Sequence, residues 1–147
     1  MQTEMNFEGA VYMRGLAVTV LLACAGLSGM AQAQTTDCAN AMTQQDMNAC
    51  AAQDLVAADR DLNAAYGQAR AFMKRLDAGL IDRQRGAEVA LRDAQRAWIT
   101  FRDNACAAEG FQMRGGSAEP LLVLGCKARL TKARADDLWS LAAGLGG

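Results

Sequence analysis

The chain has 147 residues, of which 52% are hydrophobic, and its formal net charge is −1. This length fits one domain with a modest core, and the lack of net positive charge argues against binding to nucleic acid or to an anionic membrane surface. The sequence contains no histidine, so a Ser-His-Asp or Cys-His site cannot form within it and the commonest metal ligand is absent. We therefore expect no catalytic residues, no metal site and no cofactor.

Residues 1–33 have the features of an export signal. An uncharged apolar stretch covers 15–29, Arg14 precedes it, and Ala31-Gln32-Ala33 forms an A-x-A cleavage site. The stretch is too short to span a bilayer comfortably. The sequence therefore predicts a mature domain over 34–147 that is periplasmic or secreted, with no membrane span. Without the signal, the numbers of acidic and basic residues are equal.

Two alternatives stay open for the signal region. Leu21-Leu22-Ala23-Cys24 resembles a lipoprotein box, in which Cys24 would carry a lipid anchor. The A-x-A site favours the soluble form over this lipoprotein. Acidic residues are unusual ahead of such a signal, and a start of translation at Met13 rather than Met1 would remove them.

Four cysteines remain after the signal: Cys38, Cys50, Cys106 and Cys126. An even number of cysteines in a small exported domain predicts disulfides, whereas zinc is disfavoured because there is no C-x-x-C pair and no histidine. Three pairings are possible. We favour Cys38 with Cys50 and Cys106 with Cys126, because each is local in sequence. A helical hairpin that turns near Gly116 would also place the second pair at matching depth.

The first predicted helix begins after Thr43, which can cap it, carries Asp46 in its first turn, and ends at Gly79. Its apolar residues alternate spacings of three and four, which is typical of a helix packed in a bundle. These residues are Leu55, Ala58, Leu62, Ala65, Ala69, Phe72 and Leu76, with Tyr66 beside them.

The second predicted helix begins near Asp82 or Arg83 and ends before Gly115. Its apolar stripe consists of Ala87, Leu91, Ala94, Trp98, Phe101 and Ala105. Ser117 is the predicted N-cap of a third helix, with Pro120 in the first turn, where a missing N–H costs little. The third stripe consists of Leu121, Leu124, Ala128, Thr131, Ala135 and Leu138, and glycines from Gly144 onward end the helix.

Three amphipathic helices with short connections predict an all-α fold, a small antiparallel bundle held by two disulfides. Tyr66, Trp98 and Phe101 are predicted to anchor its core. Asn63 and Gln95 are candidates for a buried polar pair between the first two helices. Arg102-Asp103 is assigned to a surface or half-buried ion pair rather than to a ligand clamp.

The most specific stretch of the sequence is LRDAQRAWITFRDNAC at 91–106, which accompanies Asp46-Met47-Asn48-Ala49-Cys50, Gly115-Gly116-Ser117 and Cys126. These residues and the cysteine spacings resemble a bacterial family related to the N-terminal domain of the lysozyme inhibitor LprI. The resemblance covers nearly all of 38–138. It implies a helical, disulfide-bonded envelope protein, and the family name implies inhibition of lysozyme. No catalytic residues are associated with the family.

The candidate partner-binding segment is the polar turn made by Arg114, Gly115, Gly116, Ser117 and Glu119. A loop held in shape by a disulfide loses less entropy when it binds an enzyme cleft. Arg114 and Glu119 are candidates to contact acidic and cationic groups of that cleft. The resemblance points to a muramidase as the protein partner. The alternative is a periplasmic binding or structural module whose partner is not a lysozyme.

Overall fold

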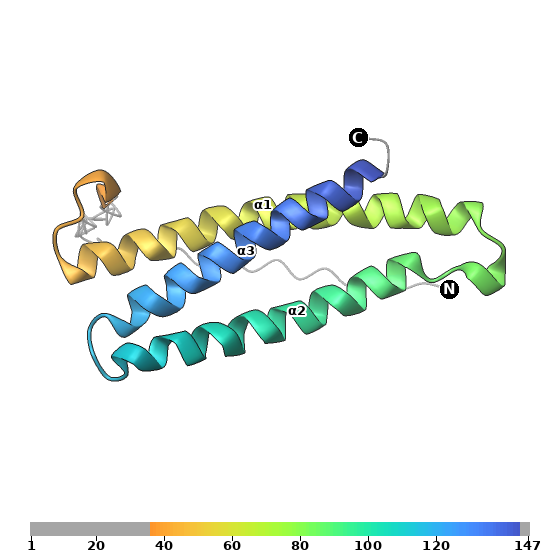
Figure 1. Cartoon of the computed structure of the whole chain (residues 1–147). Coiled ribbons are helices and arrows are strands. Elements are labelled where there is room, and N and C mark those ends of the chain that lie inside the picture. The colour runs from red at the N-terminus through yellow and green to blue at the C-terminus, as the bar shows by residue number, and fades with distance from the viewer. Residues whose placement is uncertain (1–35, 145–147) are drawn as a thin grey trace, which may run out of the picture. The chain divides into compact units, whose positions relative to one another are not determined.

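The computed structural model describes residues 36–144, which contain three α-helices joined by short connections (Figure 1). The helices are α1 (Gln44–Gly79), α2 (Ala87–Gly110) and α3 (Glu119–Ala143). Three 3-10 helices accompany them: η1 (Cys38–Asn40), η2 (Asp82–Gln84) and η3 (Phe111–Met113). Consecutive α-helices run in opposite directions, and α3 packs most extensively on α1. The predicted all-α bundle is confirmed, whereas the predicted signal and Cys24 lie outside the described residues.

Thr43 caps α1 as the sequence predicts. Its hydroxyl accepts a hydrogen bond from the Asp46 N–H at 3.1 Å, and the Asp46 carboxylate accepts one from the Thr43 N–H at 3.3 Å. This reciprocal pair is a capping box, which satisfies two backbone donors that a helix start leaves free. The predicted end of the helix at Gly79 is also confirmed.

The hydrophobic core lies in the part of the bundle away from the α2–α3 turn. Its buried members are Leu62, Ala65, Ala69, Leu91, Ala135 and Leu138. Fully burying one leucine side chain stabilises the fold by roughly 1.5–3 kcal/mol. Tyr66 and Trp98 are partly buried and pack against this cluster, as predicted.

The inward face of α2 differs from the predicted stripe. The prediction that Phe101 anchors the core is wrong, because its side chain is 60% exposed, and Ala94 of the same stripe is exposed as well. Gln95 and Arg102 occupy inward positions instead, where they find hydrogen-bond partners on neighbouring helices. Alanines lie on more than one side of α2, so apolar spacing alone does not define its buried face. They are Ala87, Ala90, Ala94, Ala97, Ala105, Ala107 and Ala108.

Two predicted helix starts are wrong. The segment near residues 82 and 83 forms only η2, and α2 begins later, at Ala87. Ser117 does not cap α3, because the N-cap position belongs to Ala118 and no side chain bonds to the helix start there. Pro120 does lie in the first turn of α3, and Gly144 ends the helix, as predicted.

Asp77, near the end of α1, caps the start of α2. Its carboxylate accepts hydrogen bonds from the backbone N–H groups of Gly86 (2.9 Å), Ala87 (2.9 Å) and Glu88 (3.0 Å). The N-cap residue Gly86 has no side chain and a φ of +141°, a conformation that favours glycine. The three hydrogen bonds, led by the one from Glu88, hold the pKa of Asp77 below its usual value.

Asp77→Asn is expected to lower the urea midpoint of unfolding at neutral pH and to flatten its pH dependence. The pKa of Asp77 is depressed in the folded state, so the contribution is present above the ordinary aspartate pKa and is lost as pH falls below about 4. Urea unfolding between about pH 7 and pH 3 measures this. Asp136→Asn, on the exposed side of α3, is the control. Parallel pH profiles of wild type and Asp77→Asn would contradict the capping role.

Candidate functional site

Backbone hydrogen bonds shape the turn between α2 and α3. The Gly116 N–H donates to the Met113 carbonyl at 2.9 Å, and the Glu119 N–H donates to the Gly116 carbonyl at 3.2 Å. Gly115 has a φ of +77°, in the left-handed region that glycine adopts without steric cost. The chain therefore reverses direction here within a few residues of fixed conformation.

Arg114 and Glu119 bind each other across this turn. Nη1 of Arg114 lies 2.6 Å from Oε1 of Glu119, and the other carboxylate oxygen accepts the Gly115 N–H at 2.8 Å. The hydrogen bond from Gly115, with further help from Arg114, lowers the pKa of Glu119. The Arg114 guanidinium also lies over the ring of Phe111, 4.8 Å from its centroid. Glu119 therefore holds the turn in shape, and Arg114 is already engaged within it.

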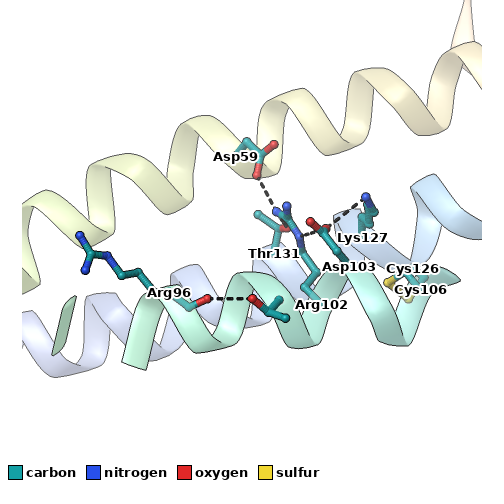
Figure 2. Close-up of polar contacts among 9 residues, drawn as sticks. Asp59, Arg96, Arg102, Asp103, Cys106, Cys126, Lys127 and Thr131 are labelled. Carbon is teal, nitrogen blue, oxygen red and sulfur yellow. Dashed lines mark hydrogen bonds and ion pairs between the residues drawn. A yellow bond between two sulfur atoms is a disulfide. The ribbon is translucent and has the colours of Figure 1, made fainter. Parts of the chain in front are cut away.

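Two disulfides lie at the turn end of the bundle, and both favoured pairings are confirmed. Cys106–Cys126 joins α2 to α3 directly below the turn, with a Cα–Cα distance of 5.4 Å (Figure 2). Cys38–Cys50 ties η1 to the start of α1. The Asn48 side chain of α1 donates to the Ser117 carbonyl at 3.0 Å, which links the α2–α3 turn to α1.

The helices approach closely beside the turn. A Cβ atom on Gly110 would lie only 2.5 Å from Cγ2 of Val123, so α2 and α3 need a glycine at this crossing. A larger residue would push the two helices apart and strain the nearby disulfide.

The turn exposes large apolar side chains. Phe111 is 63% exposed and Met113 is half exposed, and they lie three residues and one residue before Arg114. Aromatic, methionine and arginine side chains are enriched in protein–protein interfaces. The sequence pattern did not single out Phe111 or Met113, because the predicted apolar stripe of the second helix ends at Ala105.

A charged layer lies next to the Cys106–Cys126 bond (Figure 2). Nη1 of Arg102 donates to Oδ1 of Asp59 at 3.2 Å and to Oγ1 of Thr131 at 3.1 Å, which links α2 to both other helices. Nε of Arg102 donates to Oδ1 of Asp103 at 3.1 Å, and Nζ of Lys127 lies 3.1 Å from the same oxygen. Burial raises the pKa of Asp103, but the hydrogen bonds from Lys127 and Arg102 outweigh it and lower the pKa overall.

These contacts assign the inward polar residues of α2 to structural roles. The Arg102–Asp103 ion pair is present, as predicted. The predicted pair between Asn63 and Gln95 does not form, because Gln95 accepts a hydrogen bond from Nε of Arg134 at 3.1 Å and Asn63 is exposed. Such a layer fixes the register of the helices, since a shifted helix would leave buried polar groups without partners.

Within residues 36–144, no group of three or more His, Cys, Asp or Glu side chains is placed to hold a metal ion. Over the same residues, no helix has the length and apolar character needed to cross a membrane. The α2–α3 turn presents exposed apolar side chains and the Arg114 guanidinium on a segment of fixed conformation.

The fold and the turn thus define a small, disulfide-bonded three-helix protein with an ordered, partly apolar turn at one end. The sequence model of the family described as "Lysozyme inhibitor LprI" matches residues 35–138. The chain belongs to this family, as the resemblance of its motifs implies.

Two known proteins are similar to this chain. Uncharacterized protein R02472 of Rhizobium meliloti (strain 1021) is 45% identical over 128 residues, which cover 85% of this chain and 91% of that protein. The crystal structure of a DUF1311 family protein (PP0307) from Pseudomonas putida KT2440 superposes with a TM-score of 0.61 at 27% identity. The superposition covers 71% of this chain and 99% of that one, and the DUF1311 family is the same family.

Proposed function

We propose that this protein is exported and inhibits a lysozyme-type muramidase by binding it through the α2–α3 turn. Membership of the LprI family supports a lysozyme-inhibitor-like role. The observation that carries the mode of binding is the exposure of Phe111 and Met113 beside Arg114, on a turn that Cys106–Cys126 already holds in shape.

The α2–α3 turn needs little change of conformation to bind a partner. Ordering a flexible loop on binding costs conformational entropy, which a turn held by a disulfide and by Glu119 has already lost. Burying a phenylalanine or methionine side chain completely stabilises a complex by roughly 1.5–3 kcal/mol. A muramidase must admit a polysaccharide chain, so its cleft is concave and can receive a convex turn.

Export is supported by the two disulfides, which persist in oxidising compartments, and by the predicted signal at 1–33. On this proposal the protein acts by occupying the cleft of its partner rather than by catalysing a reaction. A turbidity assay tests the proposal directly. The purified oxidised protein should slow the clearing of a cell-wall suspension by lysozyme, and no slowing at a large molar excess would remove the proposal.

Phe111→Ser is expected to raise the concentration needed for half-maximal inhibition by about tenfold, because it removes an apolar contact worth about 1.4 kcal/mol. Phe101→Ser is the matched control, since Phe101 is exposed to a similar extent but lies outside the turn, on α2. The same turbidity assay measures both variants. Equal loss of inhibition in the two variants, or none for Phe111→Ser, would clear the turn of the role.

A further inference from the structure

A groove of about 550 Å³ lies between α1 and α3, away from the α2–α3 turn. Four of its lining residues are small: Ala57, Ala58, Gly125 and Ala128. Its volume falls within the range of about 300–1,000 Å³ that is typical of small-molecule sites. We refer to it as the α1–α3 groove.

The two walls of the α1–α3 groove carry opposite charges. Asp54 and Asp61 line it from α1, whereas Arg129 and Lys132 line it from α3. Among the ion pairs of the described residues, none joins one wall to the other, and neither Asp54 nor Lys132 takes part in one. Opposite charges therefore face the same hollow without neutralising each other directly.

The remaining two wall residues are held in place from outside the groove. The Asp61 carboxylate accepts a hydrogen bond from the Trp139 indole N–H at 2.9 Å. Nη2 of Arg129 lies 3.0 Å from Oε2 of Glu109 on α2. Each of these contacts uses only part of the hydrogen-bonding capacity of a carboxylate or a guanidinium, which has further acceptors or donors to offer.

Gly125 contributes to the open space of the α1–α3 groove. It lies inside α3, where glycine is less favourable than alanine by about 1 kcal/mol. Its φ is not positive, and a Cβ atom added there would meet no atom within 4 Å, so neither backbone conformation nor packing requires a glycine. A side chain at this position would therefore extend into the α1–α3 groove.

We propose that the α1–α3 groove binds a short zwitterionic peptide, with its ammonium group toward Asp54 and Asp61 and its carboxylate toward Arg129 and Lys132. A free peptide carries one charge of each sign at its two ends, which matches walls of opposite sign. An internal segment of a protein carries such a pair only through particular side chains. This site is separate from the turn and does not rest on the proposed inhibition of a muramidase.

Trialanine is a suitable probe, titrated into the purified, oxidised, ¹⁵N-labelled protein. The indole N–H of Trp139 contacts Asp61, so its NMR signal reports on the α1 wall. We expect a saturable shift of this signal, and binding weaker by about tenfold or more for trialanine blocked at both ends by acetyl and amide groups. No saturable shift, or equal binding of the blocked peptide, would overturn the proposal.

Charge-matched variants identify which wall binds which end. Asp54→Asn should weaken the binding of trialanine but not of N-acetyl-trialanine, which has no ammonium group. Lys132→Gln should weaken the binding of trialanine but not of trialanine amide, which has no carboxylate. If either variant weakens all three peptides equally, its wall does not recognise the end assigned to it and the proposed orientation is wrong.

Filling the groove supplies a further test with a matched control. Gly125→Leu places a side chain in the groove, whereas Gly67→Leu adds the same side chain at an open helical position that does not line it. We expect only Gly125→Leu to weaken trialanine binding, by about tenfold or more, with lysozyme inhibition unchanged in both. Equal binding in the two variants would overturn the proposal. The proposal would also be overturned if the protein did not bind trialanine and Gly125→Leu lost lysozyme inhibition. The groove would then bind a segment of the muramidase rather than a free peptide.

Discussion

Replacing Cys106 and Cys126 together with alanine is expected to lower the free energy of unfolding by about 3–4 kcal/mol. The bond closes a loop with a sequence separation of 20, so its loss gives the unfolded chain more conformational freedom. Both cysteines are also buried, so the two sulfur atoms form part of the packing below the turn and leave a space when removed. Urea unfolding of the oxidised proteins at neutral pH measures the difference.

The Cys38–Cys50 bond provides the comparison for this prediction. It closes a shorter loop, with a sequence separation of 12, and Cys38 is exposed. Replacing this pair with alanine should cost about 2 kcal/mol and leave the packing below the turn intact. A loss as large as that for Cys106 and Cys126 would show that loop closure alone, and not burial, sets the effect.

Arg102→Ala is expected to destabilise the protein by about 2–4 kcal/mol. Its side chain is only 14% exposed and bonds to Asp59, Asp103 and Thr131, so its removal leaves polar groups on all three helices short of a partner. It also lies over the ring of Trp98, and alanine would lose that contact. Urea unfolding measures the loss.

Arg96→Ala is the matched control on the same helix. The Arg96 side chain is 73% exposed, its ion pair with Asp93 is long at 4.0 Å, and Figure 2 shows it pointing away from the charged layer. Its replacement should change the free energy of unfolding by less than about 0.5 kcal/mol. Arg102→Met separates packing from hydrogen bonding, because it keeps most of the contact with Trp98. If Arg102→Met were as stable as wild type, the hydrogen bonds of the charged layer would contribute nothing to the free energy of unfolding.

The parts of the fold that could be predicted are those determined by local chemistry. A capping threonine, an acidic residue in the first turn and one unbroken apolar stripe define α1, and the structure agrees at both ends of that helix. The disulfide pairing also follows from spacing, since the turn falls midway between Cys106 and Cys126. Each of these signals needs only neighbours along the chain.

The inward face of α2 could not be predicted, because it depends on partners from other helices. Arg102 faces inward because Asp59 and Thr131 accept its hydrogen bonds. Gln95 faces inward because its side chain accepts a hydrogen bond from Arg134. An apolar-periodicity rule instead places Phe101 inside. Ser117 does not cap α3, because the helix begins at Glu119 and Ala118 occupies the N-cap position.

The sequence predicts a turn between the second and third helices at Arg114–Glu119, and the structure has its turn there, whereas partner binding by this turn stays a prediction. Two oppositely charged residues in a glycine-rich segment can face outward to a partner or bind each other, and the sequence pattern does not distinguish these arrangements. In the structure Arg114 and Glu119 bind each other. In the proposed function, Phe111 and Met113 then provide the apolar contacts, together with the donors of Arg114 that do not bind Glu119.

The buried apolar cluster and the two cross-links occupy different halves of this small molecule. Leucines and alanines stabilise the half that contains Leu62 and Leu138, whereas the opposite half depends on its cystines. A newly made chain in a reducing compartment would consequently keep helical structure around Leu62 while the tip stayed loosely organised. On the export proposed above, oxidation after translocation would complete the tip, so the surface proposed to bind a partner would form only outside the cytoplasm.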